Sequence, residues 1–296
     1  MPTQFIRGIH LSYDDKGPID APPIVFIHGH PFNRSMWDEQ VAHFSNSYRL
    51  ILPDLRGYGE TGLPYETDAS SATRLTSTTN PADGSRSTSA AAAPPTKTLL
   101  DEMALDIAHL LETLNIRHAI FCGLSMGGQI ALDFYRLFPQ KVRALLIVDS
   151  DARGETPGSR VNRLNIAEEI LAKGMVRHTD ETIHKYIAPA SMHNKKVYDP
   201  LYRMMSSTSP AGAAAAHRGR ADRRDHTAIL KDITVPSLVI VGAEDFFTPL
   251  PIAKIMSDNI PGCRLACIEG AGHLPNMETP GTFNKIVEEF LNQLDK

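Results

Sequence analysis

The sequence predicts a protein of the α/β class, with a mostly parallel sheet flanked by helices. Short runs of Val, Ile and Leu alternate along the chain with longer amphipathic stretches, which is the order that parallel strands joined by helices produce. The strand candidates are apolar throughout, as they are when helices cover both faces of a sheet. The chain has 296 residues, enough for one large domain with a well-buried core.

The expected elements alternate from residue 22 to the end of the chain. Apolar side chains recur at helical spacing on one face of residues 99–116, which predicts a helix there. Further helices are expected over residues 127–139 and 282–294. Continuous apolar runs bounded by Pro, Gly or polar residues predict strands over residues 22–29, 48–57, 118–123, 142–150, 236–245 and 264–273.

Two segments interrupt this alternation. Residues 151–234 are too long for one crossover helix and hold several helical patterns, such as 161–175 and 180–188. We therefore expect a helical cap over 151–234, inserted into a core made of residues 1–150 and 235–296. Residues 66–97 are dominated by Ser, Thr and Ala and hold almost no large apolar residues. Such a segment cannot bury enough surface to offset its ordering entropy, so we interpret it as a disordered insertion in a surface loop.

Composition, charge and the start of the chain favour a soluble, cytoplasmic protein whose partner is neither nucleic acid nor a membrane. The formal net charge is −4, and nothing in it favours nucleic acid or an anionic membrane as a partner. The start of the chain, MPTQFIRGIH, lacks the apolar core of a secretory signal, and no apolar run approaches the roughly 20 residues of a membrane span. The three cysteines are an odd and sparse count, which fits a reducing compartment. Cys263 and Cys267 are four residues apart in an expected strand, a span of about 13 Å, which is too long for a disulfide.

The run Gly123-Leu124-Ser125-Met126-Gly127 fits the G-x-S-x-G pattern of a nucleophile elbow. In such an elbow the serine occupies a strained turn from strand to helix, and the flanking glycines leave room for neighbouring backbone. The expected strand before it and helix after it supply that context. The alternative, a purely structural Gly-Ser-Gly turn, stays open for the bare pattern.

A nucleophilic serine needs a base and a carboxylate that orients the base. His273 follows the last expected strand through a loop of small residues, and Asp245 directly follows the strand before it. The order Ser125, Asp245, His273 is the order found in one large class of serine hydrolases.

Other carboxylates near the strand ends compete for the orienting role. Asp149 and Asp151 follow the strand over residues 142–150 and remain alternatives to Asp245. Glu244 would point to the opposite side in an extended segment, so we set it aside.

Acyl transfer also needs N–H donors for the oxyanion. The backbone N–H of Met126 comes with the elbow, and the N–H of His30 is the natural second donor because Pro31 has none. His28 and His30 have the spacing of a metal pair, but no third ligand lies nearby in the sequence. We therefore expect neither a metal nor an organic cofactor.

The remaining candidates concern substrate binding. Phe32, Trp37 and Phe247 are expected as apolar walls of the pocket. The run HRGRADRRDH over residues 217–226 mixes cations with Asp222 and Asp225. We expect it to be a solvated helix face, since mixed charge runs usually lie at the surface. The alternative is a cationic patch that binds a substrate carboxylate.

Taken together, the motifs HGHP, DLRGYGET, GLSMGG, GAEDFFTP and GAGHLPNMETP resemble those of the α/β-hydrolase superfamily along nearly the whole chain. Within it, the chain looks most like small serine carboxylesterases and 3-oxoadipate enol-lactonase-like hydrolases, to which the run DSDARGETPGSRVNR is also similar. The resemblance implies the α/β-hydrolase fold and the triad Ser125, Asp245 and His273. It also implies an oxyanion hole made by His30 and Met126, and hydrolysis of a small carboxylic ester through an acyl-enzyme.

Several other activities remain compatible with these residues. Haloalkane dehalogenases and epoxide hydrolases carry Asp at the elbow and are set aside because this chain has Ser125. Lactonases of the enol-lactone type, C–C bond hydrolases and cofactor-free haloperoxidases or perhydrolases share a Ser triad. A non-catalytic ligand-binding protein of this fold is a further alternative. The sequence leaves the acyl and alcohol groups of the substrate and the oligomeric state open.

Overall fold

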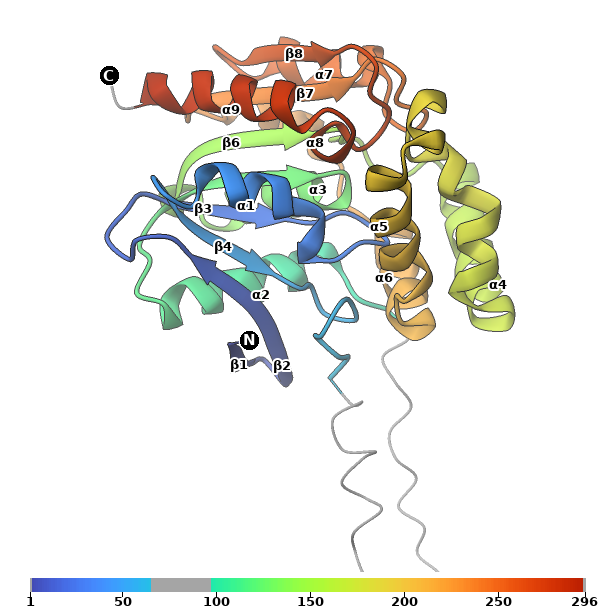
Figure 1. The fold of residues 1–296 in the computed structure, drawn as a ribbon. Coiled ribbons are helices and arrows are strands. Elements are labelled where there is room, and N and C mark those ends of the chain that lie inside the picture. Colours follow the sequence, from blue (N-terminus) through green and yellow to red (C-terminus); the bar gives the residue numbers. More distant parts are fainter. Residues whose placement is uncertain (1, 65–96, 295–296) are drawn as a thin grey trace, which may run out of the picture.

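In the computed structural model, which describes residues 2–64 and 97–294, the core is a twisted sheet of eight strands (Figure 1). The strand order is β1-β2-β4-β3-β5-β6-β7-β8. The pairs β1–β2 and β2–β4 are antiparallel and all others are parallel. The strands are β1 (Thr3–Ile6), β2 (Ile9–Lys16), β3 (Pro23–Ile27), β4 (Arg49–Pro53), β5 (Ala119–Leu124), β6 (Val142–Val148), β7 (Ser237–Gly242) and β8 (Arg264–Ile268).

Helices cover both faces of this sheet. The clusters of buried side chains place α2, α3 and α7 on one face and α1 and α9 on the other. These helices are α1 (Asp38–Phe44), α2 (Leu100–Thr113), α3 (Met126–Leu137), α7 (Leu250–Asn259) and α9 (Pro280–Leu294), with the single turn α8 (Pro275–Glu278) before α9.

The central strands are buried on both sides, which explains their uninterrupted apolar sequences. In β3, Val25 and Ile27 pack into the α2–α3 side, whereas Ile24 and Phe26 pack into the α1–α9 side. Successive side chains of a strand point to opposite faces, so each face needs its own apolar set. The α/β class with a mostly parallel sheet, predicted from these runs, is thereby confirmed.

Two strands and two helices described next were not among the elements expected from the sequence. The strands β1 and β2 form an antiparallel hairpin at one edge of the sheet, where polar and exposed residues interrupt the buried ones and leave only a weak apolar signal. The helices α1 and α7 are short, with 7 and 10 residues, and each buries only two side chains. A short helix with so narrow an apolar face leaves little periodicity for sequence inspection to detect.

Residues 151–234, here called the helical segment, lie beyond the carboxyl ends of the parallel strands (Figure 1). Its helices are α4 (Pro157–Thr182), α5 (Lys195–Ser206) and α6 (Pro210–Ala221). Gly174, with φ 79°, interrupts α4. Of the expected helix over 180–188, only the first residues are α-helical, since a 3-10 turn covers Ile183–Lys185.

Helix α6 lies unusually close to the backbone of the core. A Cβ added to Gly212 would come within 1.9 Å of the Gly57 carbonyl oxygen, and one added to Gly219 would come within 1.6 Å of the Thr98 carbonyl oxygen. The Thr98 N–H also donates to the Ala215 carbonyl over 3.0 Å. Only a helix of Gly and Ala can approach this closely, so these residues fix where α6 places its longer side chains.

Other expectations concern the insertion, membrane spans and cysteines. The insertion expected over residues 66–97 lies outside the described residues except for Lys97, which forms an ion pair with Asp222. Within the described ranges, no helix has both the length and the apolar character needed to cross a membrane. Cys122, Cys263 and Cys267 are all free thiols, as the spacing argument predicted.

Candidate active site

Ser125 occupies a strained turn between β5 and α3. Its backbone has φ 56° and ψ −114°, a region that L-residues rarely adopt. The glycines beside it are required by contact. A Cβ on Gly123 would come within 2.3 Å of the Gly127 carbonyl oxygen, and one on Gly127 would come within 2.2 Å of the Ile27 carbonyl oxygen. The sequence therefore folds here into the elbow geometry that the G-x-S-x-G pattern predicts.

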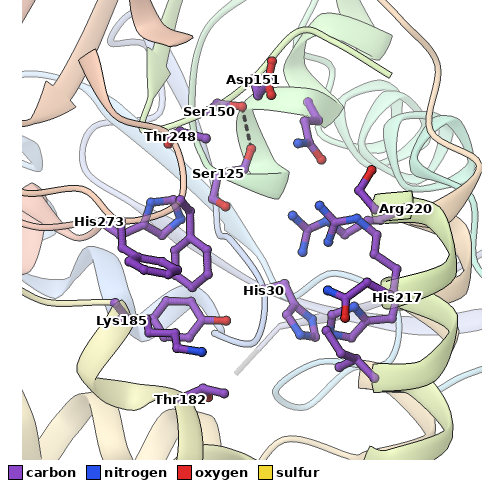
Figure 2. A pocket seen from close by; sticks show the side chains of 18 of the residues that line it. His30, Ser125, Ser150, Asp151, Thr182, Lys185, His217, Arg220, Thr248 and His273 are labelled. Atoms are coloured by element: carbon purple, nitrogen blue, oxygen red, sulfur yellow. Dashed lines mark hydrogen bonds between the residues drawn. The ribbon is translucent and has the colours of Figure 1, made fainter. Parts of the chain in front are cut away.

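Helix α3 begins immediately after the elbow. Met126 is its first residue, so its N–H has no acceptor within the helix and lies at the positive end of the helix dipole. The Ser125 N–H donates to the Val148 carbonyl over 2.8 Å, and Ser150 Oγ donates to the Ser125 carbonyl over 2.7 Å (Figure 2). These bonds attach the elbow to the end of β6.

His273 and Asp245 come together after β8 and β7. His273 Nδ1 lies 2.9 Å from both carboxylate oxygens of Asp245. The Phe247 N–H and the Thr248 hydroxyl also donate to that carboxylate. Burial raises the pKa of Asp245, but the His273 ring and these hydrogen bonds outweigh burial and hold the pKa below its usual range. Asp245 is therefore ionised and oriented toward the imidazole.

The alternative acids occupy different surroundings. Asp149 is buried, accepts the Gly242 N–H through Oδ1 over 2.8 Å, and its carboxyl group lies beside that of Asp245. Burial, and then the nearby Asp245 carboxylate, raise the pKa of Asp149 well above its usual value. Asp151 forms an ion pair with Arg153 at 2.9 Å.

The loop after β3 brings His30 to the same site. Its Nδ1 lies 2.7 Å from the Tyr58 hydroxyl, and its Nε2 is buried without a partner. His28 is held differently, because its Nδ1 lies 2.8 Å from the Gly29 carbonyl and its Nε2 accepts the Leu55 N–H over 3.0 Å. With both ring nitrogens engaged, His28 fixes two loops and is not available as a metal ligand.

Ser125, His273 and His30 line one cavity of about 360 Å³ between the sheet and the helical segment (Figure 2). This size suits a small molecule. Phe247 lines the cavity and packs against the His273 ring, with centroids 5.0 Å apart.

Phe32 and Trp37 do not line this cavity, which corrects their expected role as pocket walls. Both are fully buried in the core. Phe32 packs against Tyr186 with ring centroids 5.4 Å apart, and Trp37 packs against Phe26 at 5.0 Å. The sequence places both near the oxyanion loop but does not show that neighbouring elements cover them.

The prediction that residues 217–226 form a solvated helix face is wrong for His217 and Arg220. His217 and Arg220 are only 5% and 9% exposed and, together with Arg223, line the cavity. Asp222 and Asp225 are exposed, as expected. One feature of the sequence could have indicated this burial. The run AGAAAAHRGRA is rich in Ala and Gly, so a helix formed by it has small side chains and can pack closely against the core. Lys185 and Arg163, which also line the cavity, had no such signal.

Two groups of side chains in the described residues are close enough to share a metal ion. One is Asp149, Asp245 and His273, and the other is His30, His178 and His217; within each, the potential ligand atoms lie within 4.8 Å of one another. The third ligand that the sequence did not offer to His30 thus comes from the helical segment. The first group is already accounted for by the hydrogen bonds between His273 and Asp245.

Comparisons with known proteins agree with this fold. The model described as the alpha/beta hydrolase family matches residues 24–286. The chain is 25% identical over 295 residues to 3-oxoadipate enol-lactonase 2 of Acinetobacter baylyi, covering 99% of this chain and 97% of the relative.

Two solved structures extend the comparison. A thermophilic esterase from Thermogutta terrifontis with malate bound has a TM-score of 0.84 and 29% identity, covering 97% of this chain and 95% of that one. The enol-lactonase from Burkholderia xenovorans has a TM-score of 0.82 and 25% identity, covering 98% and 100%. The family match spans strands β3 to β8, the elbow and the helical segment. The chain belongs to the alpha/beta hydrolase family.

Proposed function

We propose that this protein is a serine hydrolase that cleaves a carboxylic ester of a small substrate through an acyl-enzyme. Ser125 is the nucleophile, His273 is the general base and acid, and Asp245 orients the histidine. The observation that carries the proposal is the strained elbow serine, at φ 56°, in the same cavity as a histidine bonded to a buried carboxylate. The esterase and enol-lactonase relatives support this reaction class.

In the first half of the reaction, Ser125 Oγ attacks the ester carbonyl while His273 Nε2 takes the hydroxyl proton. The backbone N–H groups of Met126 and His30 stabilise the oxyanion that forms. Asp245 holds Nδ1 of His273 and stabilises the imidazolium. The imidazolium then gives its proton to the departing alcohol.

The second half repeats these steps with water. His273 takes a proton from water as the water oxygen attacks the acyl carbonyl, and the same two N–H groups stabilise the second oxyanion. Collapse of that intermediate releases the carboxylic acid, and His273 returns the proton to Ser125. The cavity volume and the malate bound to the Thermogutta esterase both support a small, polar substrate.

A lactone is the second candidate substrate. The Acinetobacter and Burkholderia relatives are enol-lactonases, and opening a lactone uses the same attack on a carbonyl. The difference is that the alcohol formed by ring opening remains attached to the acyl group.

A substrate panel with a matched pair of variants tests the proposal. We expect hydrolysis of short p-nitrophenyl esters or of lactones by the purified protein, and its loss in Ser125→Ala. Ser257→Ala, which removes a hydroxyl from α7 outside the cavity lining, should retain full activity. Background rates for the unmodified protein across all esters and lactones would favour a non-catalytic binding protein. Peroxide-dependent bromination faster than ester turnover would favour a haloperoxidase.

A further inference from the structure

Arg220 is a buried cation for which the protein supplies no anion. It lies on α6, is 9% exposed, and its Nε has no hydrogen-bond partner. No carboxylate of the described residues lies within ion-pair distance of its guanidinium. An ionised group is rarely buried in this way unless something compensates its charge.

The acidic residues of the cavity are engaged elsewhere. Glu155 pairs with Arg163 at 2.5 Å and with Arg223 at 3.1 Å. Asp151 pairs with Arg153 at 2.9 Å. Neither carboxylate is therefore available to neutralise Arg220.

The net charge of the cavity wall is positive. Four cations line the cavity, namely Arg163, Lys185, Arg220 and Arg223, against two carboxylates, Asp151 and Glu155. Burial, followed by the nearby Arg163 and Arg223, lowers the pKa of Arg220 to about 9, so its guanidinium is protonated at neutral pH. The space in front of Arg220 consequently attracts an anion.

Neutral histidines surround the same space. His217, three residues before Arg220 on α6, has both ring nitrogens buried without partners, and its ring centroid lies 4.3 Å from that of His30. Burial, and then nearby cationic groups, lower the pKa of both rings, so they are neutral at pH 7. Each neutral imidazole retains one N–H with which it can donate to an anionic oxygen.

The position of this anion-binding space relative to the nucleophile is set by α6. Figure 2 shows Arg220 and His217 across the cavity from His273, with Ser125 between them in the view. A cavity of about 360 Å³ lets one small molecule contact both the elbow and Arg220.

We propose that Arg220, assisted by His217, binds a free carboxylate carried by the substrate, so that the protein acts on monoesters of dicarboxylic acids or on lactones that carry a separate carboxylate. This inference rests on the proposed function for the ester bond that is cleaved. A guanidinium offers two parallel N–H donors that match a carboxylate, which makes Arg220 a specificity-determining residue.

The cluster of His30, His178 and His217 has the spacing of a metal site, but its surroundings oppose a cation. Burial lowers the pKa of His217 most, and Arg220 and Arg163 lower it further by repulsion of positive charge. A divalent ion at the same place would experience the same repulsion twice over, whereas a carboxylate would be attracted.

Two isosteric esters separate charge recognition from shape. Monomethyl succinate carries a free carboxylate, and methyl 4-methylpentanoate has a neutral branched end of similar shape. We expect a higher kcat/KM for monomethyl succinate, followed by proton release in a pH-stat. In Arg220→Met this kcat/KM should fall by about 10- to 100-fold, the value of a charge-assisted hydrogen bond. The neutral ester should change little.

Arg218→Met is the matched control, because Arg218 lies on the same helix but pairs with Glu168 at 2.7 Å and does not line the cavity. It should leave the preference for monomethyl succinate unchanged. Arg220→Lys should retain part of it, since the charge remains without the two-donor geometry. Equal turnover of both esters by the unmodified protein, or equal losses of both in Arg220→Met, would overturn the carboxylate site.

A binding measurement makes the test independent of catalysis. Succinate should raise the melting temperature of Ser125→Ala but not of Arg220→Met, and Arg220→Met by itself should melt no lower than the unmodified protein because it removes an uncompensated buried charge. If succinate stabilises the protein while no ester or lactone is turned over, the carboxylate site stands and the proposed function fails. Stronger stabilisation by inorganic phosphate than by succinate, or a His217-dependent stabilisation by Zn²⁺ with none by succinate, would overturn the carboxylate assignment.

Discussion

At the scale of single residues, two adjacent carboxylates at the site differ in what surrounds them. Asp245 accepts hydrogen bonds from the Phe247 N–H and the Thr248 hydroxyl and faces the His273 ring. Asp149 accepts the Gly242 N–H, and burial beside Asp245 raises its pKa. The environment therefore favours the ionised form of Asp245 and the protonated form of Asp149.

This difference predicts unequal effects of removing each charge on catalysis. Asp245→Asn should lower kcat by about 10⁴, because the amide cannot hold the histidine in its productive tautomer. Asp149→Asn keeps an oxygen for the Gly242 N–H and should lower kcat by less than about tenfold. Steady-state kinetics on one ester measure both. Equal losses would mean that Asp149, the alternative acid, shares the orienting role.

The stability of Asp149→Asn relative to the unmodified protein should increase as pH rises. The folded-state pKa of Asp149 is raised, so as pH rises the unfolded chain loses this proton first, from about 4 upward. Ionisation then favours the unfolded state, and the unmodified protein loses stability that the Asn variant cannot lose. Urea unfolding at pH 4.5 and 7.5 should show the variant gaining relative to the unmodified protein at the higher pH. An equal difference at both pH values would contradict a raised pKa of Asp149 in the folded protein.

At the scale of elements, close approach of backbones positions the site. The elbow depends on α3 packing directly on the end of β3, and the anion-binding wall depends on α6 packing on the loops at Gly57 and Thr98. In both places glycine is required because a side chain would separate the two backbones.

Gly127→Ala tests this dependence. Its new Cβ would meet the carbonyl oxygens of Ile27 at 2.2 Å and His28 at 2.9 Å, so we expect a loss of about 1–3 kcal/mol in the free energy of unfolding. Activity should fall as well, because Ser125 and Met126 move with α3.

The matched control for that variant is Gly158→Ala. Gly158 lies in the first turn of α4 with nothing within 4 Å of its added Cβ. We expect this change to raise the free energy of unfolding by about 0.4–1 kcal/mol through the entropy of the unfolded chain. Urea denaturation measures both, and equal changes in the two variants would show that contact at Gly127 is not limiting.

At the scale of the whole molecule, no disulfide holds the fold, since all three cysteines are free. The melting temperature should therefore be the same with and without dithiothreitol. Thiol titration should give three reactive groups in the denatured protein without prior reduction, and no fast reaction of the buried Cys122 in the native protein. A lower melting temperature in reductant would reveal a disulfide between two chains.

The cavity also belongs to the whole molecule, because its lining comes from residues as far apart in sequence as His30 and His273. Parallel strands deliver Ser125, Asp245 and His273 to one edge of the sheet. The helical segment then closes the space above them, with Arg220 on the opposite wall. The proposed catalytic groups, at the edge of the sheet, and the proposed carboxylate site, on the helical segment, thus face the same cavity from opposite sides.

Much of this arrangement follows from the sequence because it depends on local patterns. Continuous apolar runs predict six of the eight strands, and the glycines around Ser125 predict the elbow. The chain order of Ser125, Asp245 and His273 predicts which loops meet, since parallel strands place their following loops at a common edge. The edge hairpin was missed because polar residues interrupt its apolar ones, and the short helices α1 and α7 were missed because each buries only two side chains.

Only the tertiary structure decides how charged and aromatic side chains are buried. Phe32 and Trp37 turn into the core rather than the cavity, and Arg220 turns into the cavity rather than toward solvent. Whether a charged side chain is paired depends on which residues from distant parts of the sequence pack against it, and a local sequence pattern does not contain that information. The sequence by itself therefore determined the sheet and the reactive serine. The close packing of α6 on the core, which only the tertiary structure shows, places Arg220 in the cavity, and this position is the basis for proposing that the substrate carries a carboxylate.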